Sequence, residues 1–296
     1  MPTESQKTAK AADRVQVRKT YKLYIGGAFP RSESGRSYPV TDKKGTLLAQ
    51  AAQGSRKDVR DAVVAARKAQ PGWAKATAYN RGQVLYRVAE MLEGRREQFA
   101  AEVAAAEGIT SAKALSTVDD AIDRWVWYAG WADKYAQIVG SSNPVAGPYF
   151  NFSLPEPTGV VGVLAPQDSS LLGLISVVAP VIATGNTAVV VASEQRPLPA
   201  ISLAEVLATS DLPGGVVNLL TGRTAELAPW LASHRDVNAI DLTGVAAPDR
   251  PPLQQAAADN VKRVYLPGGL NWTDDPGTGR LTAFVETKTV WHPIGV

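Results

Sequence analysis

The sequence contains few side chains that could act as a nucleophile. It has no cysteine and two histidines, His234 and His292, which lie far apart in the chain. Without cysteine there can be no thiolate nucleophile, no disulfide and no zinc–thiolate site. Two distant histidines do not favour a histidine-based metal site either. Ser169 and Ser170 are possible nucleophiles, but a serine needs an activating base, and neither histidine is near them in the sequence.

Other polar residues follow short apolar runs, and these runs must be the elements that position them. Asp168 comes after "GVVGVLA", Glu194 after "TAVVV", and Thr243 and Gly244 after "NAIDL". Apolar runs bounded by glycine or proline are typical of strands that are buried on both faces. We therefore expect these polar residues to lie in loops that follow strands.

Five such runs alternate with helical segments between residues 158 and 269. This alternation predicts an α/β fold with a Rossmann-like open parallel sheet. Ligands of such sheets bind outside the carboxyl ends of the strands, where the polar residues above are expected. The first of these loops, "APQDSSLLG", has no G-x-G-x-x-G fingerprint. The pattern thus predicts a nucleotide-type scaffold without in itself predicting a nucleotide site.

The residues before this region are predicted to form β structure and helices over 21–135. The helical pattern of "RKDVRDAVVAARKA" should end at Pro71 and Gly72. A long second helix is expected from about Asn80 past Val103, and a third over 117–135. Turn residues followed by the alternating "YFNFSL" predict a β hairpin over 136–157.

The formal net charge of +3 belongs to the first twenty residues. This segment carries five basic and two acidic side chains, and we expect it to be a disordered basic tail, solvated and not bound to nucleic acid. The most apolar stretch, "LLGLISVVAPVIATG", is too short to cross a bilayer. The N-terminus lacks the apolar core of a signal peptide. These features, with the absence of cysteine, predict a cytoplasmic protein that binds no membrane.

Several segments together are similar to one known superfamily. "LYIGGAFPRSESGRSY", "PEPTGVVGVLAP", "TGNTAVVVASEQRPL", "LPGGVVNLLTG", "IDLTG" and "FVETKTVW" resemble aldehyde dehydrogenases in order and spacing, over nearly all of residues 21–291. Within the superfamily, the chain looks most like the non-catalytic second half of the family 16 type. The resemblance implies NAD or NADP as cofactor, a cysteine nucleophile, a glutamate base, and a small β flap that mediates oligomerisation.

Carried over position by position, the resemblance implies that much of the chemistry is lost. Asp168 stands where the family has an asparagine that helps to hold the oxyanion, and an ionised carboxylate cannot donate a hydrogen bond. Pro267 stands where the glutamate base should be. The family's complete catalytic domain, which carries the cysteine, is replaced by a short linker over 270–279. The resemblance therefore implies no catalytic residue in this chain.

Part of the cofactor site is retained in the sequence. Glu194 remains in "VASE" and could accept a hydrogen bond from a ribose hydroxyl, although Val191 replaces the family's lysine. Thr243 and Gly244 remain in "LTGVAAPD", although Val245 replaces a serine. The cofactor-binding residues that the resemblance implies are thus Glu194, Thr243 and Gly244.

The flap is predicted from the hairpin over 136–157 and a C-terminal strand over 280–296. In this superfamily the flap of one subunit extends the catalytic-domain sheet of another. Here a flap is present without a catalytic domain to receive one. The expectation is a non-catalytic subunit that docks by strand addition on a full-length aldehyde dehydrogenase and supports its assembly or regulation. The alternatives are an NAD(P)-binding oxidoreductase with residual or regulatory cofactor binding, an esterase, and a relic without a role.

Overall fold

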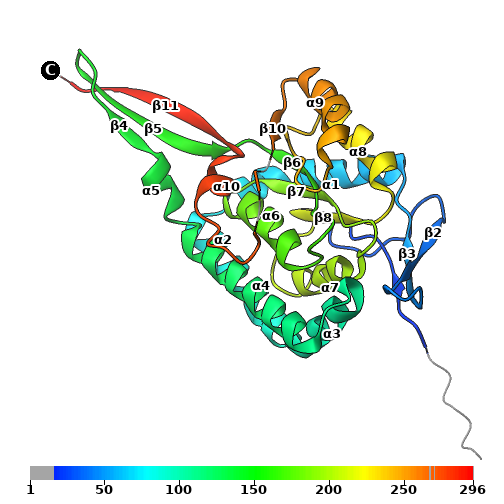
Figure 1. Ribbon diagram of the computed structural model, residues 1–296. Helices are drawn as coiled ribbons and strands as arrows, with labels where there is room; N and C mark the ends of the chain where they lie inside the picture. Colours follow the sequence, from blue (N-terminus) through cyan, green and yellow to red (C-terminus); the bar gives the residue numbers. More distant parts are fainter. Residues whose placement is uncertain (1–16, 267, 270, 296) are drawn as a thin grey trace, which may run out of the picture.

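A five-stranded parallel sheet forms the centre of the protein (Figure 1). The computed structural model describes residues 17–266, 268–269 and 271–295. The strand order is β10-β9-β6-β7-β8, and every neighbouring pair is parallel. The predicted α/β fold class is therefore confirmed. The strands are β6 (Val160–Leu164), β7 (Thr187–Val191), β8 (Val217–Leu220), β9 (Ala239–Asp241) and β10 (Arg263–Tyr265).

Helices cover both faces of this sheet. Within β6, Val161 and Val163 belong to one buried cluster, whereas Val160 and Leu164 belong to the other. Because successive side chains of a strand point to opposite faces, a sheet covered on both sides needs an unbroken apolar run. One face carries α6 (Leu172–Ala183) and α7 (Leu198–Leu207). The other carries α1 (Arg56–Lys75), α8 (Thr224–Ser233) and α9 (Arg250–Ala258), the last preceded by the short 3-10 helix η1 (Ala247–Asp249).

The N-terminal helices differ from the prediction in their bounds. The prediction that α1 ends at Pro71 and Gly72 was wrong, because α1 continues to Lys75. Its last turn is held by Trp73, which is buried and donates from Nε1 to the carbonyl of Ile182 in α6 at 2.9 Å. The expected long second helix is two helices, α2 (Ala78–Glu93) and α3 (Arg96–Glu107), separated at Gly94. They are followed by α4 (Ser111–Trp131) and α5 (Tyr135–Val139).

A small sheet at the N-terminus has the order β1-β3-β2. Its strands are β1 (Thr20–Tyr21), β2 (Ser37–Thr41) and β3 (Leu47–Ala52). The predicted disordered tail over 1–20 therefore extends too far toward the C-terminus. Thr20 pairs with Gln50 in β1, and Lys19 forms an ion pair with Glu205 at 2.6 Å. The first sixteen residues of that tail lie outside the described residues.

A three-stranded antiparallel sheet, which we call the flap, projects from the body of the molecule (Figure 1). It consists of β4 (Ser141–Asn143), β5 (Tyr149–Pro157) and β11 (Val285–Pro293), in the order β11-β5-β4. The strand expected from residue 280 begins only at Val285. Before it lies the one-turn helix α10 (Gly279–Thr282), because helical geometry turns Arg280 and Leu281 into the interior together. The predicted hairpin likewise begins with α5 and not with a strand.

Candidate functional site

The carboxyl ends of β6 and β9 form the crevice in which such a sheet would bind a ligand. The strand order reverses between these two neighbours, and this is the point at which ligands bind open α/β sheets. Asp168, Thr243 and Gly244 come together here, around a depression of about 420 Å³ that Arg250 and Trp272 also line. The structure thus brings three of the residues singled out in the sequence to one place.

Gly244 lies where two loops touch. Its amide donates to the carbonyl of Leu164 at 2.8 Å. A Cβ atom at this position would lie 1.8 Å from the carbonyl oxygen of Ala165. Only glycine fits between these two backbones, so the loop after β9 is packed directly on the end of β6.

The hydroxyl of Thr243 is already hydrogen-bonded to other side chains of the protein. Its hydroxyl makes a short hydrogen bond to Asp241 and accepts one from Arg280 Nη2 at 3.0 Å. Arg280 Nη1 donates to Asp241 Oδ2 at 2.7 Å, and the two side chains are 7% and 0% exposed. The Arg280 guanidinium also lies 4.6 Å from the centre of the Tyr265 ring. A buried ion pair therefore fills the end of β9.

Glu194 lies on the other side of the first loop. Its carboxylate accepts from Arg223 Nη1 at 2.6 Å and from the Thr224 amide at 3.0 Å, so it caps the start of α8. It lines a separate depression of about 280 Å³ with Tyr38 and Arg223. Burial and the nearby Glu194 carboxylate raise the pKa of Tyr38, and the hydrogen bond that Arg223 donates to Glu194 raises the pKa of Arg223. The three predicted cofactor-binding residues therefore do not line one cavity.

The first loop separates the two depressions. Gln167 accepts from the Glu194 amide at 2.9 Å and donates to the carbonyl of Ala165 at 2.9 Å. Arg196 donates to the carbonyl of Asp168 at 2.7 Å. These bonds hold the loop between Glu194 and the crevice.

The start of α6 does not fit the diphosphate of a dinucleotide. Such a group binds where a helix N-terminus presents several free backbone amides. The amide and hydroxyl of Ser170 donate to Glu107 Oε1, both at 2.7 Å, and the Gly173 amide donates to Ser169 at 2.9 Å. Ser169 and Ser170 are buried, and a carboxylate already lies at this position.

The start of α9 does not fit a diphosphate either. Pro251 and Pro252 lie in its first turn and have no N–H group to donate. Asp249, just before the helix, adds a negative charge at the same end. The crevice thus has the position of a dinucleotide site without the amides that such a ligand needs.

The two candidate serine nucleophiles have structural hydrogen bonds near the start of α6. Ser169 accepts from the Gly173 amide, and Ser170 donates to Glu107. His234 follows the last residue of α8, at the amino-terminal edge of the sheet and so opposite the serines. Burial lowers the pKa of His234. This arrangement pairs neither serine with a histidine, and the hydroxyl of Ser170 is bound to the Glu107 carboxylate instead.

Residues of the predicted linker pack against the helical part of the chain. Arg124 of α4 donates to the carbonyls of Trp272 and Asp274 at 2.7 and 3.0 Å. Trp272 packs against the larger buried cluster. Pro267, which the resemblance places at the position of the base, and Leu270, the first residue of the predicted linker, lie outside the described residues.

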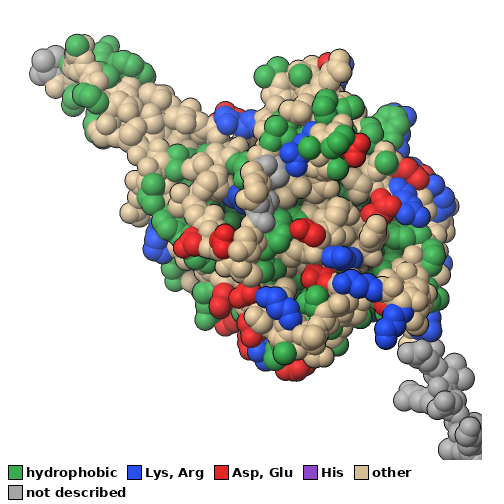
Figure 2. Space-filling view, viewed as in Figure 1, with side chains coloured by type: hydrophobic (Ala, Val, Ile, Leu, Met, Phe, Trp, Pro, Cys, Tyr) green, Lys and Arg blue, Asp and Glu red, His purple; other side chains and the backbone are tan. Residues whose placement is uncertain are grey.

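The two faces of the flap differ in polarity. On one face, Asn143 donates to Asn151 and to Ser153, and Ser153 shares a hydrogen bond with Thr289. The other face carries apolar side chains, of which Phe150 and Leu154 are 50% and 46% exposed. Hydrophobic side chains also gather near the tip of the flap (Figure 2), where Tyr149 packs on Trp291. We call the set Phe150, Phe152, Leu154 and Val290 the apolar face.

The long edge of the flap is formed by β11. The Thr158 amide donates to Phe284, and the Ile294 amide donates to Pro148. In an antiparallel ladder every second residue faces the partner strand, so the even-numbered residues of β11 face β5. The amides of Val285, Thr287, Thr289 and Trp291 therefore point outward. The opposite edge of β5 is different, because Pro155 and Pro157 lie there and have no amide to offer.

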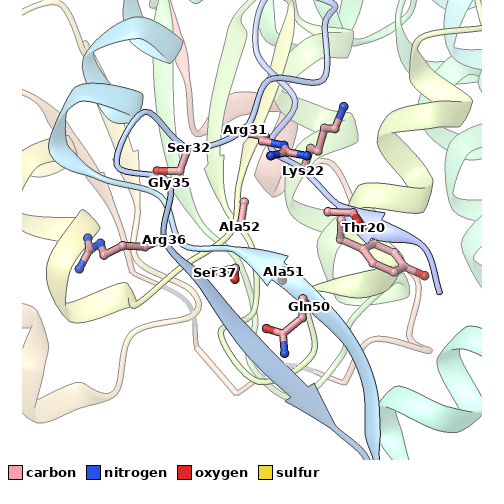
Figure 3. A pocket seen from close by; sticks show the side chains of 11 residues that line it. Thr20, Lys22, Arg31, Ser32, Gly35, Arg36, Ser37, Gln50, Ala51 and Ala52 are labelled. Carbon is pink, nitrogen blue, oxygen red and sulfur yellow. The ribbon is translucent and has the colours of Figure 1, made fainter.

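A further depression of about 220 Å³ lies on the N-terminal sheet (Figure 3). Lys22, Arg31 and Arg36 are among the residues that line it. In Figure 3 the Arg36 side chain extends away from the others, and it pairs with Glu226 at 3.1 Å. The Lys22 amino group points away from Ser37. Because Arg36 turns away from Lys22 and Arg31 and is paired with Glu226, the three cations do not form one anion site.

Residues 17–266, 268–269 and 271–295 contain neither a candidate metal cluster nor a candidate membrane span. No cluster of three or more histidine, aspartate or glutamate side chains that could hold a metal ion occurs there. Within the same residues no helix is both long and apolar enough to span a bilayer.

The fold and the position of the crevice are those of the Rossmann-like dinucleotide-binding class. Residues 29–271 match the model of the aldehyde dehydrogenase family. The chain is 37% identical over 256 residues to aldehyde dehydrogenase family 2 member B4 of Arabidopsis thaliana, covering 85% of this chain and 47% of that protein. It is 34% identical over 265 residues to mouse cytosolic 10-formyltetrahydrofolate dehydrogenase, covering 87% and 29%. The chain belongs to the aldehyde dehydrogenase family.

Solved structures agree with this assignment. The NAD+ complex of an aldehyde dehydrogenase from Bacillus cereus superposes with a TM-score of 0.77 at 27% identity, covering 83% of this chain and 50% of that one. HpcC from Thermus thermophilus gives a TM-score of 0.79 at 30% identity, covering 83% and 47%. The chain therefore spans about half the length of these structures, and less than half of the two curated relatives.

Sequence reasoning missed three residues that bind the predicted site residues. Arg223 binds Glu194, and Asp241 and Arg280 both bind Thr243. A signal was present for Asp241, because a charged residue within the apolar run "NAIDL" is rarely buried without a partner. No comparable signal marked Arg280, which lies between a polar linker and an alternating strand.

Proposed function

We propose that this chain is a non-catalytic member of its family that docks through the flap on a full-length aldehyde dehydrogenase subunit and supports its assembly or regulation. The observation that carries the proposal is the outer edge of β11, which offers unpaired backbone groups beside an apolar face. Exposed edges of this kind add strands from other chains. The prolines on the opposite edge of β5 make β11 the edge suited to docking.

The chemistry of the chain supports a non-catalytic role. Its sequence has no cysteine that could act as the nucleophile. Ser169 caps the start of α6, and the buried Ser170 is hydrogen-bonded to Glu107 with no histidine beside it. We therefore expect the purified chain to oxidise no aldehyde, and turnover by the chain alone would contradict the proposal. The absence of cysteine also agrees with a reducing compartment, so the location that we propose is the cytoplasm.

We further propose that the crevice does not bind NAD or NADP in the manner of the family's enzymes. Glu194, Thr243 and Gly244 remain in the sequence, but the first two are engaged by Arg223 and Arg280. Calorimetric titration of the purified chain with each nucleotide tests this, with the Bacillus cereus enzyme as positive control. Saturable binding below about 100 μM, or roughly 5.5 kcal/mol, would favour the alternative of a cofactor-binding regulatory subunit.

The docking experiment is co-expression with a full-length aldehyde dehydrogenase from the same genome, followed by size-exclusion chromatography with light scattering. We expect a stable hetero-oligomer. The Thr287→Pro variant should abolish it, since this amide points outward and its loss removes a donor from the free edge without breaking the ladder to β5. Thr287→Ala is the matched control and should still bind. A soluble monomer that ignores every such homologue would contradict the proposal.

A further inference from the structure

A buried ion pair lies immediately before the flap strand. Arg280 is in α10, and β11 begins five residues later. Asp241 ends β9 in the middle of the molecule and is completely buried. Its carboxylate accepts from Arg280 and from both the amide and the hydroxyl of Thr243. The pair therefore joins the return segment of the chain to the carboxyl end of the parallel sheet.

The residues beside Arg280 extend this attachment toward the flap. Leu281 and Phe284 are buried, with exposures of 0% and 1%. The carbonyl of Phe284 accepts from Asn186 Nδ2 at 2.9 Å and from the Thr158 amide at 3.1 Å. From Arg280 to Phe284 the chain is thus fixed to the body, and β11 starts from its last fixed residue.

We infer that Arg280 is the positioning residue of the flap, because it attaches α10 to the carboxyl end of β9. Asp241 and Thr243 hold the guanidinium of Arg280 there, as they would a ligand's polar group. The attachment sets the direction in which β11, and with it β5, leaves the body. This inference does not depend on the identity of any partner subunit.

A second ion pair at the base of the flap does not have the same effect. Arg263 of β10 donates to Glu286 of β11 with two contacts of 2.7 Å. These side chains are 43% and 53% exposed, and exposed pairs contribute little because water screens them. Removing one partner of a buried pair instead leaves a charge in the interior. Arg280 should therefore determine the flap's position, and Arg263 should not.

The natural absence of cysteine makes a distance measurement straightforward. Spin labels attached to Val64→Cys on α1 and Lys288→Cys on β11 join two exposed positions, one on the body and one on the flap. Pulsed electron paramagnetic resonance should give one narrow distance distribution. Arg280→Met should broaden it, and Arg280→Lys, which keeps the charge but loses the two-pronged contact, should broaden it less. Arg263→Met is the matched control and should leave it narrow.

Hydrogen exchange on the unlabelled chain distinguishes positioning from general stability. Arg280→Met should increase exchange in β11 by roughly 100- to 1,000-fold or more, the effect expected when a buried charge loses its partner, while β7 and β8 stay protected. Asp241→Leu combined with Arg280→Met removes both charges and should restore much of that protection. An unchanged distance distribution, or an equal increase of exchange in β7 and β11, would overturn the inference.

Discussion

Substitution of Gly244 by alanine is the most direct test of how the crevice is packed. The new Cβ would lie 1.8 Å from the Ala165 oxygen and 2.8 Å from the Leu164 oxygen. Both are backbone atoms, so neither can rotate away. The loop must move by more than 1 Å, roughly the amount by which this contact falls short of the closest real ones near 3.0 Å. That movement also breaks the hydrogen bond from the Gly244 amide to Leu164.

The expected loss of stability has two parts. Overpacking costs about 1–3 kcal/mol, and a lost hydrogen bond adds about 1 kcal/mol. Together they predict a loss of about 2–4 kcal/mol, which for a chain of this size corresponds to a fall in Tm of about 4–16 °C. Guanidinium unfolding followed by tryptophan fluorescence measures the free energy, and circular dichroism measures Tm.

A matched control is available in Gly279. It lies in α10, and a Cβ there would meet nothing within 4 Å. Gly279→Ala should therefore stay within about 0.5 kcal/mol of the natural protein, or be slightly more stable. The reasoning is refuted if Gly244→Ala is equally neutral, because the loops after β6 and β9 would then not be in contact as described.

Three further predictions concern other parts of the fold. Burial lowers the pKa of His234 from 6.5, so the unfolded state takes up the proton first as the pH falls. The free energy of unfolding should therefore decrease below about pH 6.5. His234→Gln should flatten this slope between pH 7 and 5. Arg263 lowers the pKa of Glu286 from 4.5. The small contribution of this ion pair to the free energy of unfolding is therefore present above about pH 4.5 and is lost below it. A Glu286→Gln variant whose stability fell equally steeply in acid would contradict this. Trp73→Phe should cost about 1 kcal/mol through the lost bond to Ile182, with increased hydrogen exchange confined to the end of α1.

The parallel sheet could be predicted because burial on both faces leaves a strong trace in the sequence. Runs such as Val160–Leu164 and Thr187–Val191 are entirely buried, so each reads as one unbroken apolar segment. Helix bounds were less predictable, since they depend on distant contacts. Pro71 is a local stop signal, yet the bond from Trp73 to Ile182 holds the helix beyond it.

The arrangement of the candidate site could be predicted only in part from the sequence. The strand ends fixed where Asp168, Thr243 and Glu194 would lie along each loop. They did not fix which cavity each side chain faces, because that depends on residues such as Arg223 and Arg280 from distant segments. A retained residue type therefore did not imply a retained free side chain.

The pairing of β5 with β11 also has a consequence for synthesis. About 130 residues separate the two strands, and a ribosome adds about 5–20 residues per second. The nascent chain thus holds β5, with Phe150, Phe152 and Leu154, for on the order of ten seconds before its main partner strand exists. During that interval the fragment resembles a folding intermediate that exposes an unpaired apolar strand. We expect chaperones that bind extended apolar segments to meet this protein at β5, while it is still being made.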